Sequence, residues 1–90
     1  MKETVQVKDK QGFIYNVVIE YSPRYGFATA YLDDAIIEQV QLGRITEPIG
    51  DSDLDWERYE ERLEEWKCEI KTNMIPICEK LCPLHNENRR

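Results

Sequence analysis

Three cysteines and the one histidine of this 90-residue chain fall in its last quarter, and these residue types could bind zinc: Cys68, Cys78, Cys82 and His85. On a helix, Cys78 and Cys82 would lie one turn apart, and His85 would follow on the same face. Cys68 would lie about 15 Å from Cys78 along a straight helix, whereas the four ligands of a tetrahedral site all contact one ion. A zinc site would need the chain to double back at Pro76, or a second subunit to supply Cys68. We therefore expect no metal and no other cofactor, and instead free cysteines beside a core.

Other patterns that could support catalysis are incomplete. The segment Asp51-Ser52-Asp53-Leu54-Asp55 has the spacing of the first calcium ligands of an EF-hand loop. That loop, however, needs glycine where Trp56 stands and glutamate where Arg62 stands. The chain has no glycine-rich phosphate loop, no HExxH motif and no nucleophile elbow. Cys82 and His85 would lie together only in a frayed last turn beside a proline. We expect a protein that is not an enzyme.

The charge of the chain is concentrated in one segment. The whole sequence has 18 acidic and 12 basic residues, a net charge of −6, which argues against a general nucleic-acid binder. Residues 47–69 alone carry ten acidic and three basic residues, a net −7. The acidity is therefore a property of one element and not of the whole surface.

On a helix, most of these acidic side chains would lie opposite the apolar positions: Glu57, Glu60, Glu61, Glu64, Glu65 and Glu69. One interpretation is a solvated face with high helix propensity. The sharper interpretation is a surface that meets a basic partner protein, because a row of carboxylates can imitate a phosphate backbone. The sequence then predicts a small acidic binding protein, a regulator or inhibitor such as phages and mobile elements encode, which occludes the basic surface of a partner. The alternative is a zinc-stabilised or purely structural dimerisation module.

Aromatic residues cluster in the first third of the chain, where six of the nine lie between residues 13 and 31. Such a cluster is more often core than a platform for stacked bases, and few basic residues lie nearby to hold phosphates, so we expect no direct contact with nucleic acid. Arg24 and Tyr25 lie in the turn Ser22–Gly26. They are candidates for a protein contact, because these residue types are enriched in interface hot spots.

The first half of the sequence predicts an antiparallel β-meander over residues 1–46. Strands are expected over Glu3–Lys8, Phe13–Tyr21 and Phe27–Leu32, separated by short glycine-containing turns. The segment Asp33–Leu42 is ambiguous between a short helix and a fourth strand, and its length slightly favours the strand.

The second half predicts a long amphipathic helix over residues 51–84, which begins at Ser52 or Asp53, with a polar tail over 85–90. Apolar residues recur at helical spacing and form a stripe that should pack on the sheet: Trp56, Tyr59, Leu63, Trp66 and Ile70. The stripe continues in register through Met74, Ile77, Leu81 and Leu84. Pro76 predicts a kink or a break within it.

These elements make one α+β domain of 90 residues. A straight helix over residues 54–82 would be about 43 Å long, whereas a seven-residue strand spans only about 23 Å. The helix must therefore fold back near Pro76, or its overhanging part must be covered by a partner helix or by a second copy in a homodimer. No apolar run is long enough for a membrane span, and three cysteines without an export signal indicate the cytoplasm.

Overall fold

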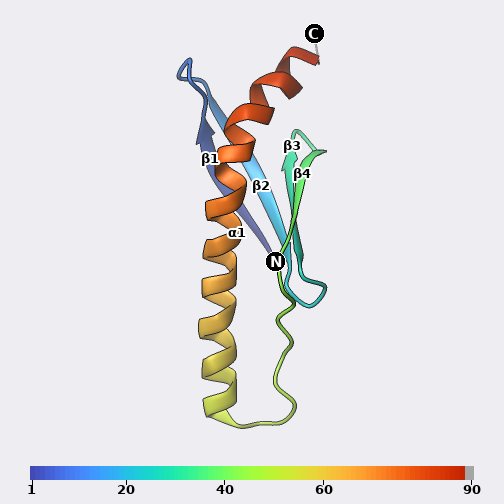
Figure 1. Cartoon of the computed structure of the whole chain (residues 1–90), viewed down its shortest axis with the longest axis vertical. Coiled ribbons are helices and arrows are strands. Elements are labelled where there is room, and N and C mark those ends of the chain that lie inside the picture. The colour runs from blue at the N-terminus through green and yellow to red at the C-terminus, as the bar shows by residue number, and fades with distance from the viewer. Residues whose placement is uncertain (89–90) are drawn as a thin grey trace.

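The computed structural model describes residues 1–88 and shows an antiparallel four-stranded meander followed by one long helix (Figure 1). The predicted α+β class is confirmed, and the ambiguous segment forms the fourth strand. The sheet order follows the chain order, β1-β2-β3-β4, and the helix covers one face of the sheet. The elements are β1 (Lys2–Lys8), β2 (Ile14–Ser22), β3 (Phe27–Leu32), β4 (Ala35–Gln41) and α1 (Asp53–Asn88).

The turn between β3 and β4 explains why residues 33–42 do not form a helix. Asp33 and Asp34 both have positive φ, 52° and 66°. Two consecutive residues of this kind match the tight hairpin turns that join twisted antiparallel strands, and Asp tolerates the left-handed region better than most residues. Asp33 and Asp34 are therefore the turn of a hairpin and not the cap of a helix.

A register shift in the β3–β4 pair changes which isoleucine faces the helix. Tyr31 pairs with Ile36, whereas Ala30 pairs with Glu38, so Ile37 is the extra residue. Regular alternation would place Ile36 and Val40 on one face, but Ile36 is 66% exposed, while Ile37 packs against the core with Val40. The bulge causes this difference, since one extra residue moves the following side chains to the other face.

α1 is a single uninterrupted helix of 36 residues, with Pro76 and Pro83 inside it. Of the two alternatives expected at Pro76, the break is absent, and the kink stays a prediction. Pro76 has no N–H to donate to the Thr72 carbonyl, which therefore lacks its helical partner. Because Pro76 is exposed, water can reach this carbonyl instead. The helix extends four residues beyond the predicted end, through residues 85–88 of the expected polar tail, and residues 89–90 lie outside the described residues.

The helix buries every fourth residue along its inner face, and Trp66, Ile70 and Met74 of the predicted stripe are among these buried residues. Its core residues are Trp66, Ile70, Met74, Cys78 and Cys82, packed on Val7, Val17, Ile19, Tyr21, Ala28, Ala30 and Leu32 of the sheet. An i, i+4 row is inclined by about 26° to the helix axis, and this inclination suits a helix that crosses a twisted sheet. Straight helical spacing had instead favoured Ile77, Leu81 and Leu84, which are only partly buried or exposed.

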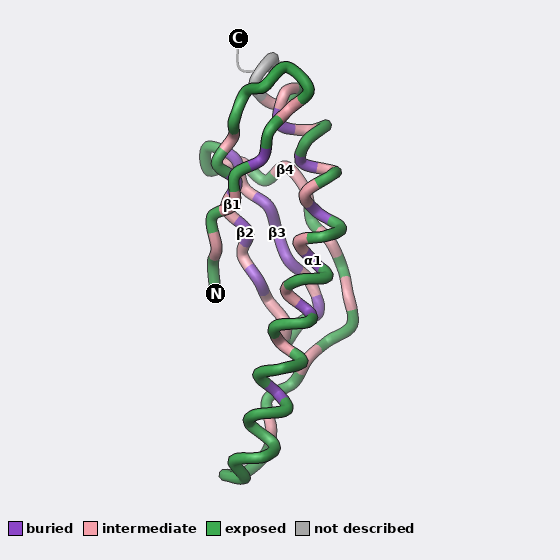
Figure 2. The backbone as a smooth tube through the Cα atoms, turned by 90° about the vertical axis from the view of Figure 1, so that its left-hand side faces the viewer, coloured by how far each residue is buried: buried purple, intermediate pink, exposed green. Residues whose placement is uncertain are grey.

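The N-terminal part of the helix extends beyond the sheet (Figures 1 and 2). The molecule measures 52 × 20 × 17 Å, and only the connecting segment from residue 42 to 52 lies beside the first helical turns. Of the predicted stripe, Trp56 is 36% exposed and Tyr59 is buried outside the sheet core. The helix does not fold back, so the overhang predicted from its length is present in the single chain.

The connecting segment is tied down at both ends. Near the sheet, Ile45 N–H donates to the Pro23 carbonyl over 2.9 Å, and Trp66 Nε1 donates to the Gly43 carbonyl over 2.8 Å. At the far end, Trp56 N–H donates to the Ser52 carbonyl over 3.1 Å, which is the first helical bond and places Ser52 at the N-cap. Among the described residues, no helical stretch is apolar enough over the necessary length to cross a membrane.

Candidate functional site

Five glutamates of the outer surface of α1 form the acidic face, which we define as Glu57, Glu60, Glu61, Glu64 and Glu65. All five are exposed, and together they line one shallow hollow of about 450 Å³. The structure therefore brings five of the six predicted carboxylates together on one surface, and the sixth, Glu69, is exposed one turn further along the helix.

Little positive charge lies on the acidic face. Within residues 1–88, its one ion pair joins Glu64 to Lys67 over 3.4 Å, and the Glu64 side chain is still 71% exposed. Arg58 and Arg62 line a neighbouring groove of about 600 Å³, which Glu61 of the acidic face borders together with Glu47 and Asp55. The carboxylates are therefore largely free to meet cations from outside the chain.

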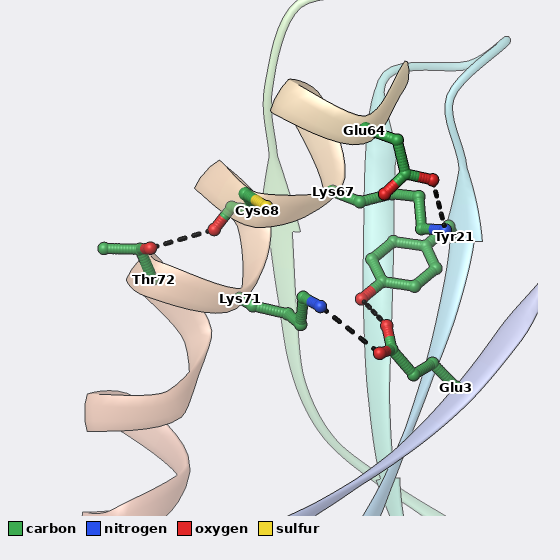
Figure 3. Close-up of polar contacts among 7 residues, drawn as sticks. All are labelled: Glu3, Tyr21, Glu64, Lys67, Cys68, Lys71 and Thr72. Atoms are coloured by element: carbon green, nitrogen blue, oxygen red, sulfur yellow. Dashed lines mark hydrogen bonds and ion pairs between the residues drawn. The ribbon is translucent and has the colours of Figure 1, made fainter. Parts of the chain in front are cut away.

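A polar cluster on the inner side of the helix fixes it against β1 and β2 (Figure 3). The Tyr21 hydroxyl donates to Glu3 over 2.8 Å, and Lys71 Nζ lies 3.2 Å from the other oxygen of the same carboxylate. Lys67 Nζ lies 5.6 Å from the centre of the Tyr21 ring. The cluster sets the position of α1 along the sheet, because one carboxylate accepts from a strand and from the helix at once.

The surroundings of this cluster shift two pKa values in opposite directions. The hydrogen bond from Tyr21 lowers the pKa of Glu3, with a further contribution from Lys71. Burial, followed by the bond to Glu3, raises the pKa of the Tyr21 hydroxyl well above its ordinary value. Sequence reasoning missed this cluster because Glu3 and Lys71 are 68 residues apart and no local pattern connects them.

Arg24 and Tyr25 lie apart from the acidic face. Both are exposed in the β2–β3 turn, and the Tyr25 side chain is 66% exposed. Within residues 1–88, no hydrogen bond or ion pair connects them to the glutamates. A partner that contacts both would have to reach from the turn around to the outer surface of the helix.

The four zinc candidates are not brought together. Cys68 is exposed, whereas Cys78 and Cys82 are buried and unpaired in the core. Burial raises the pKa of each buried thiol to about 11, which opposes the thiolate form that zinc requires. His85 Nε2 is buried without a hydrogen-bond partner. Among the described residues, no group of three or more His, Cys, Asp or Glu side chains could hold a metal ion.

Exposed apolar side chains at the overhanging end were not predicted as site residues. Ile49 is fully exposed, and Leu54 is 54% exposed. The available signal was the presence of large apolar residues inside a segment otherwise composed of acidic and turn residues.

Comparison of the chain with models of protein families, with curated proteins and with solved structures finds no significant match in any of the three.

Proposed function

We propose that this protein is a small acidic binding protein that regulates or inhibits a partner by occluding its basic surface. The observation that carries the proposal is the acidic face, where five exposed carboxylates share one surface and only Glu64 has an ion-pair partner within residues 1–88. The partner is a protein whose basic residues bind a polyanion such as nucleic acid.

The charge density of the acidic face matches that of a nucleic-acid strand. Residues 57 to 65 rise about 12 Å along the helix axis, which gives about one carboxylate per 3 Å. One strand of B-DNA carries a phosphate about every 3.4 Å. A basic groove that follows a phosphate backbone therefore encounters a similar linear charge on this helix.

The acidic face has a cost for the free protein. Glutamates four residues apart repel each other at 57/61, 60/64 and 61/65, by roughly 0.2–0.5 kcal/mol for each pair in an isolated helix. A face whose task was only to be solvated would be more stable with alternating charges. Mixed-sign pairs three residues apart offset part of this repulsion: Arg58 with Glu61, Arg62 with Glu65, and Glu64 with Lys67. A basic partner would remove the remaining repulsion on contact.

The decisive experiment compares two charge reversals on the same helix. One variant carries Glu61→Lys in the acidic face. The control carries Glu79→Lys, which is also exposed, lies far from the acidic face along the helix and changes the net charge equally. The tagged proteins capture partners from a lysate of the native host, and quantitative mass spectrometry identifies each bound protein.

We expect the acidic-face variant to lose a specific basic partner by at least about tenfold, because close charge pairs dominate such interfaces. The control variant should retain the partner. A zero-length carbodiimide should cross-link lysines of the partner to residues 57–65, and nucleic acid should compete with the captured complex. Equal capture by both variants, or cross-links confined to other carboxylates, would contradict the proposal.

A further inference from the structure

The overhanging end of the molecule combines acidic and apolar side chains, and we call residues 47–57 the projecting tip. Five acidic residues and no basic residue lie in this segment. Ile49, Leu54 and Trp56 are its exposed large apolar side chains. Exposed apolar groups rimmed by charge are typical of a surface that another molecule covers.

The projecting tip is ordered without a partner. Trp56 Nε1 donates to the Gly50 carbonyl over 3.0 Å, which ties the connecting segment to the helix. Trp56 also packs edge-on against Tyr59, with ring centroids 5.7 Å apart. Gly50 takes a φ of 112°, which glycine adopts readily and which turns the chain into the helix. The exposed Ile49 and Leu54 are therefore presented on a preformed surface, which lowers the entropy lost on binding.

The opposite end of the molecule holds a groove of complementary character. The β1–β2 turn and the C-terminal part of α1 enclose about 630 Å³, and we call this hollow the end groove. Its basic residues are Lys8, Lys10 and Lys80, and its apolar residues are Pro76, Pro83 and Leu84. This volume lies within the range of about 300–1,000 Å³ that is typical of binding pockets.

The end groove has three lysines against two acidic residues, a net charge of +1. The carboxylate of Asp9 accepts from the backbone N–H groups of Gln11 and Phe13 over 2.9 Å each, and from the Tyr15 hydroxyl over 3.1 Å. These bonds hold the Asp9 carboxylate in the β1–β2 turn. Glu79 is the other acidic residue, against three lysines.

We propose that the projecting tip of one copy binds in the end groove of a second copy, so that the protein associates head to tail. Charge complementarity and the apolar residues of both surfaces select this occupant. The two surfaces lie at opposite ends of the 52 Å long axis, so one chain cannot join its own tip to its own groove (Figure 1). Each added copy leaves one tip and one groove free, which builds open chains or closed rings.

The test uses two complementary variants, neither of which alters the acidic face. The tip variant carries Ile49→Lys and Leu54→Lys, and the groove variant carries Lys8→Glu and Lys80→Glu. All four residues are exposed, so both variants should keep the circular dichroism spectrum of the native protein. The control is Ile36→Lys, which is also exposed but lies on β4, at the sheet edge opposite β1, and lines neither surface.

Sedimentation from micromolar to millimolar concentration should show wild type and control growing in average mass. Each of the other two variants alone should associate at least about tenfold more weakly. Their equimolar mixture should form a heterodimer and nothing larger, because it retains one intact tip and one intact groove. Association of wild type should also weaken in molar salt, where the screening length falls from about 10 Å to about 3 Å.

A wild type that is monomeric at every concentration would overturn the proposal. Variants that do not recombine into a heterodimer would also overturn it, since that result indicates a symmetric interface or another occupant of the groove. Because Glu61 and Glu64 are unchanged in these variants, loss of self-association together with retained partner capture would leave the proposed function intact.

Discussion

The two buried cysteines lie in surroundings that disfavour the ionised thiolate form. Cys78 and Cys82 lie in the helical row that packs on the sheet, and burial raises the pKa of both thiols to about 11. Cys68 is exposed on the same helix. The sequence predicted free cysteines beside a core and not at its centre, because straight helical spacing does not show which row the twisted sheet selects.

A thiol-specific disulfide reagent should therefore distinguish the three cysteines. At pH 8 we expect one fast equivalent, from Cys68, and two further equivalents only when the protein is unfolded by denaturant, because a buried protonated thiol is a poor nucleophile. Cys68→Ser should remove the fast phase. Two or three fast thiols in the native protein would show that Cys78 or Cys82 is accessible to the reagent, which would contradict their burial.

The bond between Tyr21 and Glu3 should make a pH-dependent contribution to stability. Tyr21→Phe should lower the free energy of unfolding by about 1 kcal/mol at neutral pH, the usual net value of one hydrogen bond. Tyr25→Phe is the matched control, since Tyr25 is 66% exposed and its loss should change stability by less than about 0.5 kcal/mol.

The pKa of Glu3 is lowered in the folded state, so its ionised form stabilises the protein above the ordinary value of 4.5 and this stabilisation is lost as the pH falls further. Denaturant titrations should show the effect of Tyr21→Phe shrinking below pH 4.5. Above the ordinary value of 10.0, the raised pKa of Tyr21 has the opposite consequence, because the unfolded chain ionises first and stability falls. An effect of Tyr21→Phe that is constant from acid to neutral pH would contradict the coupling to Glu3.

Among the elements, local sequence patterns were sufficient to predict the first three strands but not the details of β4 and α1. The first three strands were predictable from alternation and glycine turns, because short antiparallel hairpins depend on local sequence. β4 was ambiguous because its bulge at Ile37 breaks the alternation. The continuity of α1 was not predictable, because local rules treat an interior proline as a stop, whereas packing of Met74 and Cys78 on the sheet holds the helix together across Pro76.

Replacing Pro76 should measure what the interior proline costs. Pro76→Ala restores an N–H for the Thr72 carbonyl and a better helix former, so we expect the free energy of unfolding to rise by about 1–3 kcal/mol. Pro48→Ala, in the connecting segment, should instead lower it by about 0.4–1 kcal/mol, because the unfolded chain gains freedom. Chemical denaturation of both variants tests the difference in sign. A destabilised Pro76→Ala would mean that the path of the helix over the sheet depends on a bend at this proline.

For the whole molecule, the main feature is that the acidic surfaces and the end groove lie at different ends of the long axis. The acidic face was predictable from composition and helical spacing, because both depend only on the order of residues. The end groove was not, because it joins a turn near residue 10 to a helix near residue 80, and no sequence pattern reports that contact. The position of Arg24 and Tyr25 away from the acidic face also depends on the three-dimensional arrangement of sheet and helix.

Repulsion within the acidic face should lower the free energy of unfolding of the free protein. Glu61 has glutamates four residues away on both sides and Arg58 three residues away, so Glu61→Gln should raise the free energy of unfolding by about 0.2–0.5 kcal/mol at low ionic strength. The gain should disappear in molar salt. Glu79→Gln has no glutamate four residues away and should show no such gain. Thermal or denaturant unfolding at two salt concentrations checks this, and a Glu61→Gln variant that is less stable would show that the face is held by interactions other than repulsion.

The order of the elements along the chain has a consequence for synthesis. The sheet is complete at Gln41, but the helical residues that cover it run from Trp66 to Cys82. At roughly 5–20 residues per second, a ribosome needs about 2–8 s to proceed from the end of the sheet to the last of these residues. Until the last of these residues is added, the inner face of the sheet, with Val17 and Ile19, lacks its complete cover. We therefore expect the yield of folded protein to depend on translation speed and on chaperones as well as on the stability of the finished molecule.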